Sequence, residues 1–305
     1  MFELPDVSDI VALALAEDLG VSPERFGPGA IGAPDLLARD VTTISAVGLD
    51  AQFAGHIVCR EDAVVAGLPV VATVYERLAV AAGLFDPVEV FPLVAEGARV
   101  GEGTPVATVE GLAAAVLAGE RTALDFLMML SGIATETARW VEVAGPGLAV
   151  CDTRKTVPGL RALSKYAVAV GGGTNHREGL FDMVLVKDNH ITSAGGVAAA
   201  VGKARAAHPD LIVEVEADTV AQAREAVEAG AHMVLLDNMD DATLAEAVVA
   251  VRKAAAPTGR HVLTEASGGI TRVRLAALRA AGVDRVSASA LTMGVPVVDF
   301  GFDEG

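Results

Sequence analysis

Ile212-Val-Glu-Val-Glu216 and Met233-Val-Leu-Leu-Asp237 are two short apolar runs, each of which ends in a carboxylate. Between them, Thr219–Ala229 has apolar residues at the three- and four-residue spacing of an amphipathic helix. A strand, a helix and a second strand in this order form a βαβ unit, whose two strands lie parallel in one sheet. The segment therefore predicts an α/β fold.

The same unit recurs along the second half of the chain. From the second strand on, the expected strands begin about 20 to 30 residues apart, the period of a βα repeat. A closed eight-unit barrel needs roughly 250 residues, whereas only about 170 lie between residues 119 and 291. We therefore expect an incomplete, open α/β barrel over 119–291. It begins with a long helix, Arg121–Val143, a later helix covers Ala242–Ala254, and its other strands are Leu148–Asp152, Met183–Lys187, His261–Glu265 and Arg285–Ser289.

Residues 1–118 have a different pattern, which predicts an α+β domain with an antiparallel sheet. Helices are expected at Val7–Leu19, with Ser8 as N-cap, and at Val70–Ala82. The Gly- and Pro-rich stretch Ser22–Arg39 predicts a loop. Strands are expected at Ala51–Arg60, Val88–Pro92 and Pro105–Val109.

The charge balance excludes some classes of protein. A net charge of −17 argues against nucleic-acid binding and against adhesion to an anionic membrane, because both need a basic face. The window Gly119–His190 holds eight basic and eight acidic residues, so the rest of the chain carries the whole excess of negative charge. An anionic ligand is therefore expected near the middle of the chain.

Two further features indicate a cytoplasmic protein. The only cysteines, Cys59 and Cys151, are far apart in the sequence and have no metal-binding spacing, which fits a reducing compartment. The first residues lack the basic and apolar regions of a signal peptide. No apolar run is long enough to cross a bilayer.

Polar residues stand where the expected parallel strands end. In a βα barrel the carboxyl ends of the strands form one face, where catalytic groups gather. Residues of both signs at six such ends favour an active site over a chance arrangement. They are Asp152, Lys187, Glu216, Asp237, Glu265 and Ser289.

Three cationic segments indicate an anion site. In Asp152-Thr-Arg-Lys-Thr156, Arg154 offers a planar fork for carboxylate or phosphate and Lys155 offers a point charge. Gly171–Arg177 allows close approach of the backbone and ends in Asn, His and Arg. Lys187 follows a strand, and the neighbouring His190 is better explained as a structural histidine.

Acidic and glycine-rich segments complete the expected site. Glu214 and Glu216 share a face of one strand, and Glu216 is nearer its end. Together with Asp237, Glu216 could hold ribose hydroxyls or Mg²⁺, which prefers oxygen ligands. Ser267-Gly-Gly269 leads into an expected helix, whose first N–H groups could bind a phosphate. The sequence has no nucleophile-elbow, metalloprotease, P-loop or dinucleotide motif.

Taken in order, these segments resemble the quinolinate phosphoribosyltransferase family over nearly the whole chain. The resemblance adds further motifs to those already described. They are Ala16–Gly20, Asp40–Thr43, Cys59–Glu61, Val65–Gly67, Glu96–Val100, Glu120–Thr122, Leu130–Ala134, Pro158–Arg161, Lys165–Ala167, Leu236–Asn238 and Ser267–Ile270.

The resemblance implies a reaction in which quinolinate and phosphoribosyl pyrophosphate give nicotinate mononucleotide, pyrophosphate and CO₂, with Mg²⁺. It assigns the pyridine carboxylates to Arg121, Arg154, His176, Arg177 and Lys187. It places Lys155 at the pyrophosphate, and Glu216 and Asp237 at the ribose and Mg²⁺. It gives the 5′-phosphate to Ser267, Gly268 and Gly269, beside Ser289 and Ala290.

The resemblance also implies a fold and an assembly. The fold is an N-terminal α/β sandwich, which the segment 292–305 rejoins, and an incomplete α/β barrel. The assembly is a homodimer or larger oligomer, in which Arg121 serves the active site of the partner. The sequence departs from the family pattern at Asp125, one helical turn from Arg121, at Met128-Met129, at Ser289, and at Met293-Gly294.

Two other interpretations stay open on the sequence. One is a related phosphoribosyltransferase that acts on nicotinate or is associated with molybdenum uptake. The other is a non-catalytic binding relative. The paired cations of Arg154-Lys155 and the set Asn175-His176-Arg177 favour a dianionic pyridine.

Overall fold

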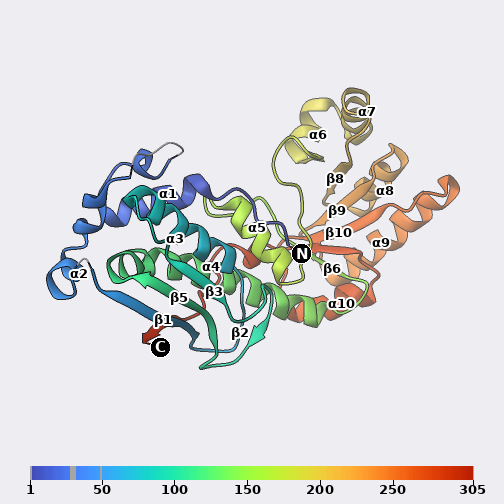
Figure 1. Ribbon diagram of the computed structural model, residues 1–305. Coiled ribbons are helices and arrows are strands. Elements are labelled where there is room, and N and C mark those ends of the chain that lie inside the picture. The colour runs from blue at the N-terminus through green and yellow to red at the C-terminus, as the bar shows by residue number, and fades with distance from the viewer. Residues whose placement is uncertain (1, 28–31, 49, 305) are drawn as a thin grey trace. The chain divides into compact units, whose positions relative to one another are not determined.

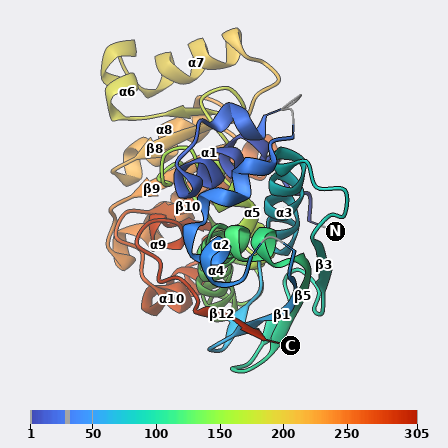
Figure 2. The ribbon, with the colours of Figure 1, turned by 60° about the vertical axis from the view of Figure 1, so that its left-hand side comes forward.

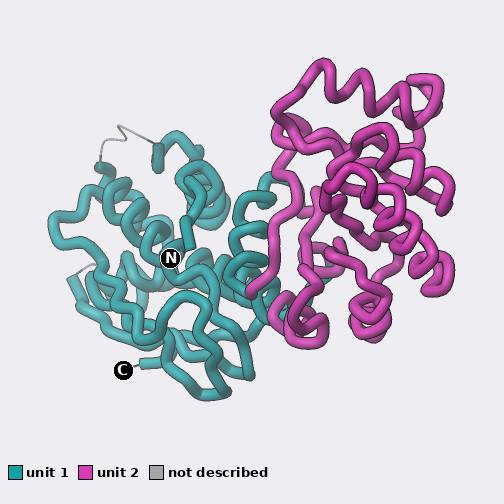
Figure 3. Tube along the Cα trace, turned by 90° about the vertical axis from the view of Figure 1, so that its right-hand side faces the viewer, with its two compact units in different colours: residues 1–136, 157–171, 294–305 teal, residues 137–156, 172–293 magenta. Residues whose placement is uncertain are grey.

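The computed structural model describes residues 2–27, 32–48 and 50–304. They form two compact units, which Figure 3 shows in two colours. The first unit contains residues 1–136, 157–171 and 294–305, and the second contains 137–156 and 172–293. The long helix α4, Ala113–Ala144, begins in the first unit and ends in the second. The first unit thus also takes in residues 119–136 and 157–171, beyond the 1–118 expected from the sequence.

The first unit is built on an antiparallel sheet of order β12-β1-β5-β3. The C-terminal strand β12 pairs with β1, which lies far from it in the sequence (Figure 1). β1 alternates buried and less buried residues, as expected for a sheet with one covered face. The strands are β1 Gln52–Cys59, β3 Glu89–Pro92, β5 Pro105–Leu112 and β12 Phe300–Glu304, with a separate pair β2 Ala63–Val64 and β4 Arg99–Val100.

Helices pack around this sheet, and α1 lies beside α3 (Figure 2). The segment before β12 packs closely on α4, because an added Cβ at Gly132 would lie 2.3 Å from the carbonyl oxygen of Pro296. The main-chain N–H of Val298 donates to the carbonyl of Met128 at 3.1 Å. The remaining helices of the unit are α1 Ser8–Leu19, α2 Val41–Ala46, α3 Leu68–Ala82 and α5 Arg161–Val170.

Two predictions for the N-terminal region need correction. Ser8 is the first residue of α1 and makes no side-chain cap; Val7 holds the N-cap position. The hydroxyl of Ser8 instead accepts from Arg77 on α3. The stretch expected as a loop contains two 3₁₀ helices, Pro23–Phe26 and Pro34–Arg39, each with proline in its first turn. Residues 28–31 of that stretch lie outside the described residues.

The second unit carries a six-stranded parallel sheet of order β6-β11-β10-β9-β8-β7, which confirms the predicted α/β class. Within the described residues the ladder ends at β6 and at β7, so the sheet is open. Most of its strand residues are apolar, as is usual for strands buried on both faces. They are β6 Ala149–Cys151, β7 Val184–Val186, β8 Val213–Ala217, β9 Met233–Asp237, β10 Leu263–Ser267 and β11 Arg285–Ser287.

Helices alternate with these strands along the chain and form the outer layer of the unit (Figure 1). They are α6 Asp188–Ala194, α7 Val197–Ala207, α8 Val220–Glu228, α9 Asp241–Ala255 and α10 Leu275–Ala280, with short 3₁₀ helices at Ala256–Thr258, Arg272–Arg274 and Ser289–Leu291. No helix among the described residues is long and apolar enough to cross a membrane.

All six predicted strands exist, but two of them end two residues away from the expected position. β10 ends at Ser267, so Glu265 lies in the middle of a buried strand and not at its end. A carboxylate can lie there because Arg285 and His176 contact it. β11 ends at Ser287, and Ser289 begins the following 3₁₀ helix.

Candidate active site

A cavity of about 590 Å³ lies at the carboxyl ends of the parallel strands of the second unit. Polar side chains from β6, β7, β8, β9 and β10, or from the loops just after them, line it. This is the face where the strand-end pattern placed the site. The lining residues are Thr153, Arg154, Lys155, His176, Arg177, Leu185, Lys187, Glu216, Leu235, Asp237, Asn238, Ser267, Gly268, Gly269 and Ser287.

Two hydrogen bonds, one of them local, fix the turn after β6. The N–H of Lys155 donates to the hydroxyl of Thr153 at 3.0 Å. The carbonyl of Lys155 accepts from the hydroxyl of Thr292 at 2.8 Å. These bonds hold the main chain of Arg154 and Lys155 in place and leave their long side chains to face the cavity.

The segment that carries His176 and Arg177 reaches the cavity because it runs beside β6. Thr174 forms a parallel bridge with Cys151, and the N–H of Thr174 donates to the carbonyl of Val150 at 2.8 Å. The buried carboxylate of Asp152 then accepts from the main-chain N–H of His176 at 3.0 Å. Two motifs separated by about twenty residues of sequence are thereby joined.

The cavity gathers four cations: Arg154, Lys155, Arg177 and Lys187. Partial burial and the charge of Arg154 lower the pKa of Arg177. Such crowding of like charges is unfavourable until an anion binds among them. The cavity is therefore suited to a ligand with several negative charges.

Two carboxylates lie on the same face as these cations. Glu216 on β8 forms an ion pair with Lys187, and Asp237 ends β9. The side-chain amide of Asn238 donates to the carboxylate of Asp237. Oxygen donors on neighbouring strands of a polar cavity fit the preferences of Mg²⁺.

The turn after β10 depends on glycine. Gly268 and Gly269 have φ of +83° and +58°, a left-handed conformation that glycine adopts without strain. A Cβ on Gly268 would lie 2.9 Å from the main-chain nitrogen of Asn238, so the two loops touch. Asn238 is the one non-glycine residue with positive φ in the described part of the chain, at +53°.

A buried acidic cluster lies beneath this face. The Nε2 atom of His176 lies 3.1 Å from the carboxylate of Glu214 and 3.3 Å from that of Glu265. The guanidinium of Arg285 lies 3.0 Å from the other oxygen of Glu265. The side chains of Glu214 and Glu265 are fully buried, and that of His176 is 7% exposed.

The cluster retains a proton at neutral pH. Burial by itself lowers the pKa of His176, but its hydrogen bonds to Glu214 and Glu265 outweigh burial and raise the pKa to about 9. Burial raises the pKa of Glu214. At Glu265 burial acts in the same direction, but His176 and Arg285 lower its pKa overall.

Not every predicted site residue lines the cavity. Arg121 lies in the first unit, and Ser289 and Ala290 lie in the 3₁₀ helix after β11. The contact of Ser289 and Ala290 with a phosphate stays a prediction. His190 is structural, as expected, because its Nδ1 accepts from the N–H of Lys187 at 2.9 Å and so caps α6.

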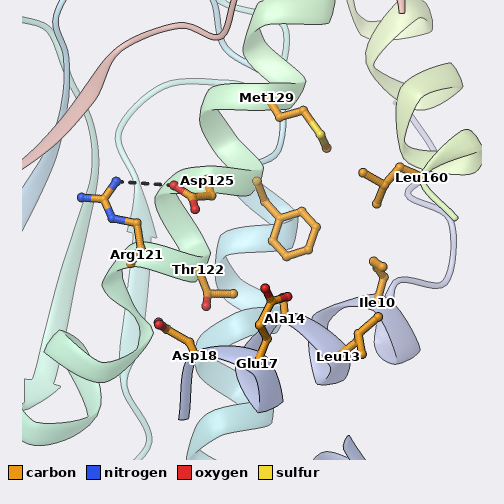
Figure 4. Close-up of a pocket in the computed structure, with 11 residues that line it drawn as sticks. Ile10, Leu13, Ala14, Glu17, Asp18, Arg121, Thr122, Asp125, Met129 and Leu160 are labelled. Carbon is orange, nitrogen blue, oxygen red and sulfur yellow. Dashed lines mark hydrogen bonds and ion pairs between the residues drawn. The ribbon is translucent and has the colours of Figure 1, made fainter. Parts of the chain in front are cut away.

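Arg121 lines a second cavity, of about 410 Å³, between α1 and α4 (Figure 4). Its guanidinium lies 3.4 Å from the carboxylate of Asp125, which is the pair expected one helical turn away. Both side chains are exposed. The acidic residues Glu17 and Asp18 of α1 lie across the cavity from them, over a mostly apolar wall.

Sequence reasoning missed Asn238 as a separate site residue, although it belongs to a motif of the resemblance. Its left-handed φ and its contact with Gly268 depend on the two loops meeting in three dimensions. Sequence reasoning also gave Glu265 no role within the buried cluster. A charged residue inside an apolar run is a signal that could have found it.

The model of the quinolinate phosphoribosyl transferase N-terminal domain matches residues 40–131, and that of the C-terminal domain matches 133–303. The chain belongs to this family. It is 39% identical over 302 residues to the nicotinate-nucleotide pyrophosphorylase [carboxylating] of Mycobacterium leprae, covering 99% of this chain and 98% of that one. It is 38% identical to a probable enzyme of the same name from Bacillus subtilis, with 88% and 89% covered. The crystal structure of NadC from Streptococcus pyogenes matches with a TM-score of 0.85 at 33% identity, covering 99% of this chain and 98% of that one.

Proposed function

We propose that the chain transfers the phosphoribosyl group of phosphoribosyl pyrophosphate to the ring nitrogen of quinolinate. Pyrophosphate leaves, the 2-carboxylate is lost as CO₂, and the electron pair left on ring carbon 2 takes up a proton from solvent. The product is nicotinate mononucleotide, a precursor of NAD. The proposal rests above all on one observation. Four cations, two carboxylates and a glycine turn line a single cavity of the second unit.

Each part of the cavity has a task in this reaction. Arg154, Arg177 and Lys187, together with His176 beside them, would bind the two pyridine carboxylates. Arg can do so through two parallel hydrogen bonds. Lys155 would neutralise the leaving pyrophosphate. The Ser267–Gly269 turn would bind the 5′-phosphate through main-chain N–H groups, as its positive φ angles allow close approach.

The carboxylates act on the ribose. Positive charge develops at the ribose carbon as pyrophosphate departs, and Glu216 and Asp237 would stabilise that charge without needing to move. Because Lys187 pairs with Glu216 in this structure, binding of quinolinate would draw Lys187 toward the substrate. Glu216 would then be available to the ribose hydroxyls.

Mg²⁺ would be held by Glu216 and Asp237, whose oxygens suit a hard cation. When bound, it would neutralise part of the charge of the pyrophosphate group. We expect the reaction to need Mg²⁺. Addition of a chelator should stop it, and addition of excess Mg²⁺ should restore it.

The protein would act in the cytoplasm as a homodimer or larger oligomer that shares its active sites. Arg121 is exposed and lies in the first unit, outside the residues that line the catalytic cavity. In the proposed dimer it would reach the cavity of the partner. Mixing inactive Arg121→Ala and Lys155→Ala chains should then restore part of the activity, because some mixed dimers contain one intact site. No recovery on mixing would argue against a shared site.

The substrate assignment is tested by offering quinolinate and nicotinate separately with phosphoribosyl pyrophosphate and Mg²⁺. We expect nicotinate mononucleotide to form in the assay with quinolinate and not in the assay with nicotinate, because the cavity has cations for two carboxylates. Product from nicotinate at an equal rate would contradict the assignment. Lys155→Ala is expected to remove turnover and leave the fold intact, as judged by circular dichroism.

A further inference from the structure

Glu214, Glu265 and Arg285, which surround the buried edge of His176, take no direct part in the reaction proposed above. The two carboxylates are fully buried, whereas Glu216, two residues from Glu214, lines the cavity. A buried carboxylate is costly unless it is paired and hydrogen-bonded. Two buried carboxylates beside one imidazole are therefore better explained by a functional role than by the stability of the sheet.

The geometry holds the imidazole of His176 on both edges. Its Nε2 edge faces Glu214 from β8 and Glu265 from β10. Its Nδ1 accepts from the main-chain N–H of Arg177 at 2.7 Å. Rotation of the ring would break contacts on both edges, so the ring and the Arg177 main chain are fixed together.

The same arrangement decides which nitrogen carries hydrogen. Because Nδ1 accepts from an N–H group, the neutral ring carries its single hydrogen on Nε2. The Nε2 edge lies against the two carboxylates, at 3.1 Å from Glu214 and 3.3 Å from Glu265. His176 is thereby fixed as one tautomer, and the orientation of its ring follows from the position of the two acids.

This arrangement fixes the position of Arg177. Its main chain is held by His176, and its guanidinium donates to the carbonyl of Met183 at 3.4 Å. Both His176 and Arg177 line the cavity beside Arg154 and Lys187. A displacement at the buried cluster would therefore appear as a displacement of the group that meets the pyridine carboxylates.

We propose that Glu214 and Glu265 are positioning residues, which orient His176 and through it the main chain of Arg177 for binding the pyridine dicarboxylate. This role rests on the proposed function. It acts on the pyridine and not on the phosphoribosyl substrate, which meets Lys155, Asp237 and the glycine turn. The two acids touch no substrate and are not catalytic.

A metal ion is the other ligand that this cluster could hold, because its ligand atoms all lie within 4.8 Å of one another. The hydrogen on Nε2 occupies the place that such an ion would take. Arg285, 3.0 Å from Glu265, also supplies positive charge that an ion would otherwise provide. The arrangement therefore favours hydrogen bonds over a metal centre. Zinc at about one ion per purified chain would overturn the positioning role.

The test compares Glu214→Leu, which removes the hydrogen-bond acceptor, with Glu214→Gln, which keeps it. Glu214→Leu is expected to raise the KM for quinolinate at least about tenfold, the effect of losing one hydrogen bond to a charged group. The KM for phosphoribosyl pyrophosphate should stay nearly unchanged. Glu214→Gln should restore the KM for quinolinate to within about threefold of the wild type, because its amide oxygen still accepts from Nε2–H.

Three outcomes would overturn the role: an unchanged quinolinate KM in folded Glu214→Leu, an equal rise in both KM values, or failure of Glu214→Gln to restore binding. Glu214 is used because Glu265 variants leave Arg285 buried beside a lost charge and are more prone to unfold. Absence of turnover in the wild type would instead sink the proposed function.

A spectroscopic readout tests the role without turnover. In protein labelled with ¹⁵N-histidine and studied above pH 9, where the ring is neutral, His176 should show hydrogen on Nε2 alone, with slow exchange of that hydrogen in the wild type and in Glu214→Gln. Exchange should become fast in Glu214→Leu. A ring that carries its hydrogen on Nδ1 in the wild type would contradict the positioning role, whatever the activity.

Discussion

Two pairs of acidic residues on one parallel sheet have different environments. Glu216 and Asp237 lie at the mouth of the cavity, where a lysine and an amide contact them. Glu214 and Glu265 lie beneath them, fully buried against His176. Glu214 and Glu216 are only two residues apart on one strand. Depth along a strand, and not residue type, thus separates groups proposed to act on the substrate from groups that hold another side chain.

The largest effect on stability is expected at the buried pair. Glu265→Leu leaves Arg285 without its ion-pair partner, and breaking a buried pair in this way costs about 3–5 kcal/mol of unfolding free energy. Asp237→Asn, at the mouth, should change the same quantity by less than about 0.5 kcal/mol. Urea denaturation of both variants measures the difference. Equal losses would mean that the two pairs do not differ as described.

The largest effect on catalysis is expected at the mouth pair. Asp237→Asn keeps the shape of the side chain and removes its charge, so kcat/KM should fall about 10²- to 10³-fold. The fall should be seen with either substrate varied. Steady-state assays of the variant beside the wild type check this, and activity within a few-fold of the wild type would exclude a role for Asp237 in stabilising charge.

The buried pair should make stability depend on pH. The pKa of His176 is raised from its ordinary 6.5 to about 9, so its contribution is complete below pH 6.5 and is lost as the pH rises through 9. The shift corresponds to about 3 kcal/mol. The groups that face the ring are Glu214, Glu265 and the main-chain N–H of Arg177, and Arg285 contacts Glu265 from the other side.

Urea denaturation at pH 6 and pH 9.5 measures this dependence. The wild type should lose more unfolding free energy over this range than His176→Asn, in which the titrating ring is absent. The control is Asp237→Asn, which should keep the pH dependence of the wild type. Identical pH dependence in the wild type and His176→Asn would contradict the assigned pKa.

A smaller effect is expected at Asn238, which joins the mouth pair to the glycine turn. Asn238→Ala places a Cβ residue at a φ of +53° without an asparagine side chain to favour it, and should cost about 1 kcal/mol of unfolding free energy. Asn238→Gly should be within about 0.5 kcal/mol of the wild type. Because both variants lose the amide that donates to Asp237, both should raise the KM for phosphoribosyl pyrophosphate. An Asn238→Ala variant with the unfolding free energy of the wild type would show that the backbone is not strained at this position.

The sequence predicted the parallel sheet because its strands are continuous apolar runs separated by amphipathic helices. It placed Glu216, Asp237 and Lys187 at one face because the carboxyl ends of parallel strands share an edge. It could not place Glu265, because the compensating Arg285 comes from a different strand and is adjacent only in the folded sheet. The 3₁₀ helices near Pro23 and Pro34 were missed because glycine and proline indicate a turn without specifying its geometry.

The most direct measurement of the central claim follows the carboxylate that should leave. Purified protein is given quinolinate labelled in the 2-carboxylate, phosphoribosyl pyrophosphate and Mg²⁺, and the label is traced together with pyrophosphate and the mononucleotide. The account predicts labelled CO₂, pyrophosphate and unlabelled nicotinate mononucleotide in equal amounts. A folded protein that releases no labelled CO₂, or a mononucleotide that keeps the label, would contradict it.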